Sequence, residues 1–586
     1  MMRTSSCGQL NLRSLDREVV LAGWVDTRRD HGDLIFIDLR DRWGVTQVVF
    51  NAAHNAEAHR KAGDLRSEFV IQVKGHVCKR PEGTVNKKIP TGEIEVFADT
   101  LEILNACPTP PFELGDQFVN EELRLKYRFI DLRRKDMVEA LTFRYRITKI
   151  VRDYLDKQEF LEIETPYLTR STPEGARDFL VPSRLVPGSF YALPQSPQLF
   201  KQLLMVAGYD RYFQLARCFR DEDLRSDRQP EHTQIDMEMS FVDEEDVMKV
   251  VEGMVAEVIE KTAGVKLEKP FRRLSYDEAM SRFGSDKPDL RFGMELKDLT
   301  PIFEGSGFKI FDECITKKGK VRGICLAPAG QELSRKDFDD LTQWIQDFGA
   351  KGLAWFKVTG PDKVESPIQK FFDAARISKV IAALGAKPGD VLFMVASDPR
   401  TSAVALGALR GHLAERFVKI PSGKLEILWV KDFPLFEWNE EEKRFQALHH
   451  PFTSPRPEDI PLLDADPAKV RARAYDLVLN GTEIGGGSIR IHREDVQEKV
   501  FRALGIGREE ARDKFGFLLK ALSFGAPPHG GIAIGLDRFS AMLLGRDSIR
   551  EVIAFPKTQK GACPMTEAPS PVSPKQLKEL NLSVKT

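Results

Sequence analysis

Residues 209–241 read YDRYFQLARCFRDEDLRSDRQPEHTQIDMEMSF, and the rest of the chain is organised around this stretch. Polar and apolar residues alternate over 211–219 and again over 233–241, which predicts two half-buried antiparallel strands. The second strand places Ile235, Met237, Met239 and Phe241 on one face and Gln234, Asp236, Glu238 and Ser240 on the other. The connecting loop is crowded with ionisable side chains. It is either a solvated hairpin tip or part of a substrate-binding face.

Composition describes an ordinary globular chain of several domains. The 586 residues correspond to roughly four domains of about 150 residues. Lys and Arg total 87 against 88 Asp and Glu, a balance that neither favours nor excludes an RNA partner. The seven scattered Cys form no CxxC pair, which indicates a reduced cytoplasmic protein without a structural metal. We expect no membrane partner, because the N-terminus lacks an apolar signal core and no long apolar run follows.

The first 107 residues predict a small β-barrel. Strand-like runs cover 19–25, 34–40, 45–50, 69–77 and 93–104, with a helical segment at 53–65 after the third. This is the element order of an OB-fold, whose exposed face often binds single-stranded nucleic acid. Phe36 has two interpretations, a core residue or an outward stacking platform, and the second is favoured because Ile35 and Ile37 share the opposite face. The predicted RNA-binding face comprises Arg28, Arg29, His31, Phe36, Gln47 and Glu93.

A Pro-rich linker at 107–111 leads to a basic run over 124–135, either a solvated helix face or a phosphate contact. A helix is predicted over 137–159, followed by an extended segment ending at Pro166. The Gly- and Pro-rich loop 171–178 is typical of a mobile lid, which would carry Glu174 over a site. Polar side chains at 195–201 begin another helix, 197–206.

Residues 288–415 change in character and predict an α+β insertion into a domain that resumes near Leu425. Strands are then expected at 425–430, 444–449 and 475–480, and a helix at 515–524. Neither GxGxxG nor a P-loop is present, so a nucleotide must be held in another way. Arg538, at a predicted strand–helix junction, is well placed for a phosphate.

Three segments together resemble motifs 1, 2 and 3 of the class II aminoacyl-tRNA synthetases: the helix–strand–Pro over 143–166, FRDE with its loop at 219–241, and GLDR at 535–538. STPEGARDF, QSPQLFK, ALHHPF and LNGTEIGGGSIRIH further resemble the bacterial-type aspartyl-tRNA synthetase family over nearly the whole chain. The implied fold is multidomain α+β, with an N-terminal OB-fold barrel, an antiparallel catalytic sheet of six to seven strands and an α+β insertion domain. The expected divisions are 1–107 for anticodon binding, 108–136 for a hinge, 137–287 and 416–556 for the catalytic domain, 288–415 for the insertion and 557–586 for a loosely packed extension.

The resemblance implies a ligase that activates L-aspartate with ATP and Mg²⁺ and then charges tRNA. Arg220 would clamp the α-phosphate and Arg538 the γ-phosphate, and these two with Glu483 form the expected catalytic set. The implied ATP-binding residues are Arg220, Asp221, Glu222, Gln229, His232, Glu483, Gly535, Leu536, Asp537 and Arg538. Asp476 and Glu483 would hold Mg²⁺. The implied aspartate-binding residues are Glu174, Ser196, Gln198, Lys201, Arg220, Asp236, His449 and Arg490, with Lys201 and Arg490 expected on the side-chain carboxylate.

The resemblance also implies tRNA as partner, with Arg225 at the acceptor end, and a homodimer built by motif 1; no DNA partner is expected. His31 and Gly83 occupy positions that in this family accompany acceptance of both tRNA(Asp) and tRNA(Asn), so we expect a non-discriminating enzyme. The alternatives are a strictly tRNA(Asp)-specific enzyme, an asparaginyl or lysyl enzyme, or a catalytically inactive RNA-binding paralogue. One departure from the family pattern is His232, where Phe usually packs on the adenine.

Overall fold

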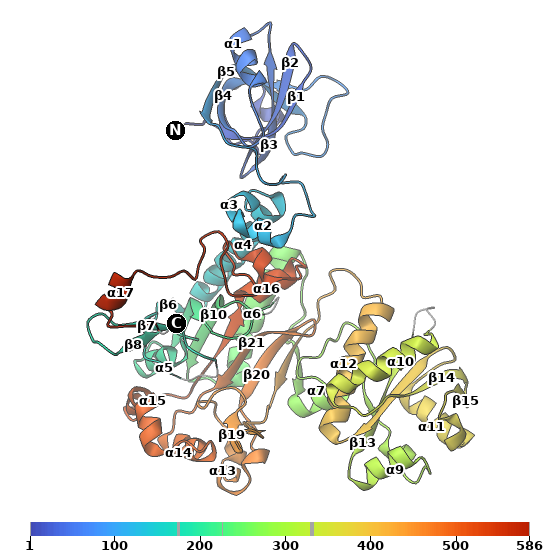
Figure 1. The fold of residues 1–586 in the computed structure, drawn as a ribbon. Coiled ribbons are helices and arrows are strands. Elements are labelled where there is room, and N and C mark those ends of the chain that lie inside the picture. Colours follow the sequence, from blue (N-terminus) through green and yellow to red (C-terminus); the bar gives the residue numbers. More distant parts are fainter. Residues whose placement is uncertain (1, 173–175, 225–226, 328–332, 585–586) are drawn as a thin grey trace. The chain divides into compact units, whose positions relative to one another are not determined.

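The computed structural model describes residues 2–172, 176–224, 227–327 and 333–584. They form two compact units (Figure 1). The first unit comprises Met1–Phe143 and Arg550–Pro571, and the second comprises Arg144–Ile549 and Val572–Thr586. Among the described residues, no helix combines the length and the apolar character that crossing a bilayer requires.

The first unit contains a closed five-stranded barrel in the order β1-β2-β3-β5-β4, which confirms the predicted OB-fold. Helix α1 lies between the third and fourth strands as expected, but it begins at Ala56 because the Asn55 side chain caps it by accepting from the Ala58 amide. Ile35 and Ile37 are buried in the barrel, and Phe36 between them points outward, half-buried. The elements are β1 (Glu18–Asp30), β2 (Leu34–Asp41), β3 (Gly44–Asn51), α1 (Ala56–Gly63), β4 (Val70–Lys79) and β5 (Ile94–Asn105).

The basic run that follows the linker has both buried and exposed members: Arg128 and Arg134 are buried, whereas Lys126 and Lys135 are exposed. It forms the short helices α2 (Glu121–Lys126) and α3 (Arg128–Asp131). Asp131 is fully buried there and pairs with Arg124 at 2.8 Å, with Arg128, and with Arg134 at 3.7 Å. These arginines therefore stabilise the first unit internally, because a buried carboxylate requires such partners.

The second unit is built on an eight-stranded sheet in the order β11-β17-β20-β21-β22-β10-β9-β6. The six strands from β17 to β9 are antiparallel, as predicted, but β11 and β6 add a parallel neighbour at each edge. The expectation of an entirely antiparallel sheet is thus corrected at its edges. The strands are β6 (Leu161–Glu162), β9 (Arg211–Phe219), β10 (Glu231–Ser240), β11 (Arg272–Ser275), β17 (Ile427–Lys431), β20 (Ala474–Leu479), β21 (Thr482–Ile489) and β22 (His529–Gly535).

The decisive stretch forms the β9–β10 hairpin, with Phe219 opposite Glu231 and Ala216 opposite Gln234. Two details differ from the prediction. Phe241 lies beyond the strand and is 74% exposed, at φ +57°. The polar face is not solvated either, since Asp236 and Glu238 are as buried as the apolar residues between them. Strand β10 is covered on both faces, so the alternation in its sequence does not indicate a solvent-exposed face.

Helices flank the sheet and position the loops that surround the site. The long helix α4 (Lys135–Lys157) confirms the predicted helical segment, and α6 begins with a capping box at Asp243 and ends at Gly264 in the left-handed conformation. The α-helices that follow α4 in this part of the second unit are α5 (Gln198–Val206), α6 (Glu244–Ala263), α7 (Tyr276–Phe283), α13 (Leu462–Ala465), α14 (Glu494–Ala503), α15 (Arg508–Leu522) and α16 (Leu536–Leu543).

The predicted insertion forms its own five-stranded antiparallel sheet, in the order β12-β13-β16-β14-β15. Apolar clusters cover both of its faces, one built around Phe338 and Phe393 and the other around Phe311 and Phe356. Its elements are β12 (Lys297–Asp298), α8 (Thr300–Phe303), α9 (Lys309–Thr316), β13 (Lys320–Leu326), α10 (Arg335–Trp344), β14 (Ala354–Gly360), β15 (Lys363–Glu365), α11 (Ala374–Leu384), β16 (Val391–Ser397) and α12 (Pro399–Phe417).

The remaining elements are two small hairpins and a C-terminal helix. They are β7 (Leu180–Pro182) with β8 (Phe190–Ala192), β18 (Phe436–Asn439) with β19 (Arg444–Ala447), and α17 (Pro574–Glu579). The expectation of a loosely packed tail beyond 556 is wrong in part. Residues up to Pro571 belong to the first unit, where Cys563 is buried and its amide donates to the Ala568 carbonyl.

Candidate active site

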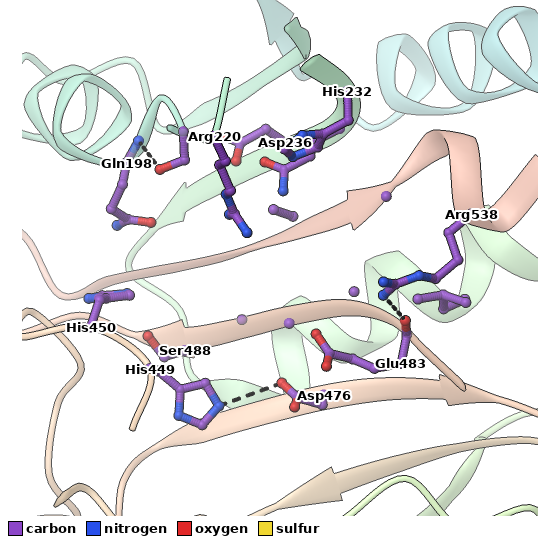
Figure 2. A pocket seen from close by; sticks show the side chains of 18 of the residues that line it. Gln198, Arg220, His232, Asp236, His449, His450, Asp476, Glu483, Ser488 and Arg538 are labelled. Carbon is purple, nitrogen blue, oxygen red and sulfur yellow. Dashed lines mark hydrogen bonds and ion pairs between the residues drawn. The ribbon is translucent and has the colours of Figure 1, made fainter. Parts of the chain in front are cut away.

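A cavity of about 660 Å³ lies over the central strands of the large sheet. Figure 2 shows side chains converging on it from β10, β20, β21 and the loops beside them. The structure brings together most of the residues predicted for ATP, aspartate and metal. Those that line the cavity are Ser196, Gln198, Lys201, Arg220, Glu222, Gln229, His232, Asp236, His449, Asp476, Glu483, Arg490, Gly535, Asp537 and Arg538.

Of the residues predicted for ATP, aspartate and metal that the structure describes, Leu536 and Asp221 do not line this cavity. Glu174 and Arg225 lie outside the described residues. Leu536 is 1% exposed and belongs to the core, and Asp221 is an exposed residue whose amide donates to the Arg177 carbonyl. The RNA-face residues belong to the first unit.

Two arginines bring positive charge to the cavity. Arg220 directly follows β9, and its Nε is buried without a hydrogen-bond partner among the described residues. Arg538, in the first turn of α16, donates from Nη1 to the Glu483 carbonyl at 2.8 Å (Figure 2). Its Nη2 pairs with Asp227 at 3.1 Å. Its Nε also lacks a partner within the described part of the chain. Buried donors left open in this way suit an anionic ligand.

Two carboxylates face each other on the neighbouring strands β20 and β21. A side chain at Gly486 would place its Cβ 2.8 Å from Asp476 Oδ1 and 3.6 Å from Glu483 Oε1, so both oxygens converge over this glycine. Asp476 and burial together raise the pKa of Glu483. Asp476 Oδ1 is buried and accepts no hydrogen bond from any described residue.

These features fit a divalent cation, which would relieve the repulsion between the two carboxylates and supply Asp476 Oδ1 with a partner. Within the described residues, no group of three or more His, Cys, Asp or Glu could hold a metal alone. This suits Mg²⁺, which completes its coordination with phosphate oxygens and water.

A buried cluster of two cations and two carboxylates lies at the same cavity. Lys201 pairs with Asp236 at 2.9 Å and with Glu238 at 3.4 Å. Glu238 also accepts from Arg490, from Nε at 2.9 Å and from Nη2 at 3.1 Å. Burial would raise the pKa of Glu238, but Arg490 and Lys201 outweigh it and hold that pKa below its usual value. The two cations expected to await a substrate carboxylate are therefore already neutralised by protein carboxylates.

Asp236 keeps one acceptor open in this cluster. Burial raises its pKa to about 6, although Lys201 acts in the opposite direction. Its Oδ1 is buried and has no hydrogen-bond partner among the described residues. An ammonium group entering the cavity would supply that partner.

Two adjacent histidines from the segment after β19 have different electrostatic surroundings. Burial disfavours the charged form of His449, but Asp476, whose Oδ1 lies 3.7 Å from the His449 Nε2, raises the pKa of His449 above its usual value. Burial and Arg490 hold the pKa of His450 well below its usual value. His450 is therefore neutral and accepts from Arg490 Nη1 at 2.8 Å, while Ser488 Oγ accepts from the same nitrogen at 2.6 Å.

Glu238, His450 and Ser488 are site residues that were not predicted from the sequence. Two of them could have been predicted from the sequence, because Glu238 shares a strand face with Asp236 and His450 is the second histidine of ALHHPF. Nothing in the sequence marks Ser488 as a site residue, because serine is common in Gly-rich strands.

Residues predicted around the nucleotide have protein partners of their own. Burial and, to a smaller extent, the positive charge of the nearby Arg220 lower the pKa of His232 to about 3. Its ring is therefore a neutral aromatic group. Glu222 pairs with Arg228 at 3.2 Å. Asp537 is only 3% exposed, accepts from the Thr233 amide at 2.8 Å and pairs with Arg144 at 2.6 Å, and so ties α16 to β10 and α4.

In the first unit, the structure clusters part of the predicted RNA face. Arg29 pairs with Asp38 at 3.0 Å and donates to Gln47 Oε1 at 3.1 Å, and the His31 ring meets Phe36 edge-on at 5.7 Å. Gln47 is buried and donates to Glu95 at 2.8 Å, which leaves it little exposed surface. Arg28 pairs with Asp30, Glu93 is exposed, and Gly83 adopts φ +82° in the loop after β4.

Comparisons with known proteins agree with this architecture. A family model described as class II tRNA synthetases (D, K and N) matches residues 120–559, and one described as OB-fold nucleic acid binding domain matches residues 19–104. The solved asparaginyl-tRNA synthetase from Pyrococcus horikoshii with asparaginyl-adenylate shares the fold, with a TM-score of 0.60, 20% identity, and coverage of 95% of this chain and 99% of its own. The chain belongs to the class II tRNA synthetases of the D, K and N group.

Within that group, relatives that match over nearly their whole length include two aspartate–tRNA(Asp/Asn) ligases. The aspartate–tRNA(Asp/Asn) ligase of Moorella thermoacetica is 58% identical, covering 99% of this chain and 96% of its own. The ligase of the same name from Aquifex aeolicus is 56% identical, covering 99% and 98%, respectively. The resemblance to the aspartyl family drawn from the motifs is confirmed.

Proposed function

We propose that the chain activates L-aspartate with ATP and transfers the aspartyl group to the 3′ end of tRNA(Asp) and tRNA(Asn). Full-length similarity above 50% to ligases with this double specificity supports the proposal. The similarity disfavours the asparaginyl and lysyl alternatives. An inactive paralogue is also disfavoured, because Arg220, Arg538, Asp476 and Glu483 all line the cavity.

The single observation that carries the proposal is that one cavity combines open cationic donors with an open buried acceptor. Arg220 and Arg538 supply donors for a triphosphate, and Asp236, in the compact Lys201–Asp236–Glu238–Arg490 cluster, supplies the acceptor. Aspartate has two carboxylates and one ammonium, and this cluster holds one open acceptor beside two cations that are already paired with protein carboxylates. Arg490 would present its guanidinium to the side-chain carboxylate, and Asp236 Oδ1 would accept from the ammonium.

The first step joins the α-carboxylate of aspartate to the α-phosphorus of ATP and expels pyrophosphate. A phosphoryl centre under attack gathers negative charge on its oxygens, which Arg220 would stabilise, while Arg538 would hold the γ-phosphate. The nucleophile is already ionised, so no general base is needed. In the second step a terminal hydroxyl of the tRNA attacks the aspartyl carbonyl, and AMP leaves.

Asp476 and Glu483 would hold Mg²⁺ against the phosphates. When bound, the ion supplies positive charge that offsets the charge of the triphosphate. His449 beside Asp476 adds to the positive potential whenever it is protonated.

The barrel of residues 1–107 would read the anticodon, with Phe36 as a stacking platform and Arg28 and Arg29 near phosphates or base edges. His31 and Gly83 are the residues that would permit both tRNAs. His31 touches Phe36, so its ring can adjust the platform directly.

A homodimer built on the motif 1 segment is part of the proposal, as is a cytoplasmic location. The edge strand β6 and the segment after it expose Leu161, Tyr167 and Leu168 at 51%, 46% and 54%. Apolar side chains clustered at an open sheet edge are typical of an interface. Light scattering should give twice the mass of one chain, and Leu161→Lys should shift the protein toward monomer.

The deciding experiment is ATP–pyrophosphate exchange with aspartate, asparagine and lysine in turn. Only aspartate should support exchange, and exchange with none of the three would overturn the enzymatic proposal. Purified tRNA(Asp) and tRNA(Asn) are then charged separately. Aspartyl-tRNA(Asn) no higher than background would leave the strictly tRNA(Asp)-specific alternative.

A further inference from the structure

A chain of buried hydrogen bonds runs from the loop before β22 to the cavity. His529 Nδ1 lies 2.8 Å from the Pro527 carbonyl, and His529 Nε2 lies 3.1 Å from the Gln202 Nε2. Gln202 Oε1 accepts from Gln198 Nε2 at 3.0 Å. His529 and Gln202 are fully buried and do not line the cavity, whereas Gln198 does.

The direction of every hydrogen bond in this chain follows from its outer end. The Pro527 carbonyl can only accept, so His529 Nδ1 carries the hydrogen. Burial lowers the pKa of His529, although Glu238 acts in the opposite direction, so the ring is neutral and its Nε2 can only accept. Gln202 must therefore turn its NH₂ toward His529 and its oxygen toward Gln198.

The same reasoning fixes the amide of Gln198. Its NH₂ is committed to Gln202 Oε1, which leaves Gln198 Oε1 as the group available to the cavity. No other partner of this oxygen is found in the described part of the chain. Gln198 and Gln202 are one helical turn apart on α5, so the helix holds the two amides in register.

We propose that His529 and Gln202 are positioning residues that set the Gln198 amide with its oxygen toward the aspartate ammonium. This rests on the proposed function and deepens it. Gln198 alone could turn either end of its amide to the cavity, and the NH₂ end would repel an ammonium. The hydrogen-bond chain His529–Gln202–Gln198, called the relay below, fixes the orientation of the Gln198 amide before substrate arrives. Gln198 Oε1 then acts together with Asp236 Oδ1 as a preorganised acceptor pair.

The experiment compares aspartate with succinate, which has both carboxylates but no ammonium. KM for aspartate and the inhibition constant of succinate are measured in ATP–pyrophosphate exchange for the wild type, His529→Leu, Gln202→Leu and His529→Gln. Glutamine at 529 has a donor NH₂ at one end of its amide and an acceptor oxygen at the other, so it can replace the donor and acceptor nitrogens of the neutral imidazole. His412→Leu, an exposed position in the insertion, is the control substitution, and thermal unfolding of each variant is recorded.

His529→Leu and Gln202→Leu should each raise KM for aspartate about tenfold, since a hydrogen bond to a charged group is lost, and leave succinate inhibition within about twofold. His529→Gln should restore most of the aspartate affinity. Gln202→Leu carries the test if His529→Leu does not fold.

Two results would overturn the relay: an unchanged KM for aspartate in both Leu variants, or an equal weakening of aspartate and succinate, which marks general damage to the site. Absence of exchange in the wild type is a different result. It would defeat the proposed function, and the relay with it, before any variant is compared.

Discussion

Glu238 accepts from Arg490 through both carboxylate oxygens, at 2.9 and 3.1 Å, and both side chains are almost fully buried. The guanidinium that would receive the substrate is thus held in a fixed plane by a protein carboxylate on the adjacent part of the sheet. Lys201 lies 3.4 Å from the same Glu238, so one carboxylate orients both cations. The site is preorganised by charge pairing within the protein.

Glu238→Gln should destabilise the protein and weaken aspartate binding. The substitution keeps the side-chain volume but leaves Arg490 as a buried cation without its partner, which costs about 3–5 kcal/mol of unfolding free energy. KM for aspartate should rise about tenfold as the guanidinium loses its fixed plane. Denaturant unfolding and exchange kinetics measure the two effects.

Glu231→Gln is the matched control, because Glu231 is on the same strand but pairs with Arg217 near the surface. Its effect on unfolding should be below about 1 kcal/mol. Equal losses in the two variants would show that Glu238 has no special role.

Arg538→Lys should raise KM for ATP and leave KM for aspartate unchanged. A lysine keeps the charge but cannot contact the Glu483 carbonyl and a phosphate at once through a fork. An increase of about tenfold is expected, measured by exchange at saturating aspartate. Arg502→Lys, an exposed position on α14, serves as control. A rise in KM for aspartate without a rise in KM for ATP would mean that Arg538 contacts aspartate and not the triphosphate.

Asp476→Asn and Glu483→Gln should each raise the Mg²⁺ concentration that gives half-maximal exchange. Each removes one of the two carboxylates that converge over Gly486, and we expect a shift of about tenfold. Gly486→Ala tests the geometry independently, because its Cβ would lie 2.8 Å from Asp476 Oδ1. A Mg²⁺ dependence that stays at the wild-type value in all three variants would refute the assignment.

The sequence predicted the architecture well because two of its signals are local. Alternation marks each barrel strand, and the position of α1 after the third strand follows from a segment capped by its own Asn55. The roles of Arg220 and Arg538 were predicted from the resemblance to motifs 2 and 3; in the structure Arg220 directly follows β9 and Arg538 lies in the first turn of α16.

The partners within the site could not be predicted, because they depend on pairing between distant segments. Glu238 and Arg490 are 252 residues apart, and only the sheet order β21-β22-β10 brings them together. Burial of both faces of β10 likewise depends on the elements packed over it. The alternating sequence of β10 alone indicates one solvent-exposed face. Asp537 was predicted for ATP from its motif, but the Thr233 amide and Arg144 occupy its carboxylate.

His232→Phe should leave ATP binding intact or tighten it, and should also change how stability depends on pH. The pKa of His232 is about 3 in the folded chain, against 6.5 ordinarily. Between these values the unfolded chain binds a proton that the folded chain does not, so the wild type loses stability as the pH falls from 6.5 toward 3. Phenylalanine does not titrate, so unfolding of the variant should depend less on pH in that window.

The exposed His412 provides the comparison, and His412→Phe should leave KM for ATP unchanged. Because His232 is neutral above pH 6.5, its ring already acts as an aromatic surface, and phenylalanine adds apolar area for packing against a base. KM for ATP in the His232→Phe variant should therefore be equal to or lower than that of the wild type. A large increase would instead mean that an imidazole nitrogen of His232 contacts the nucleotide, which packing alone does not require.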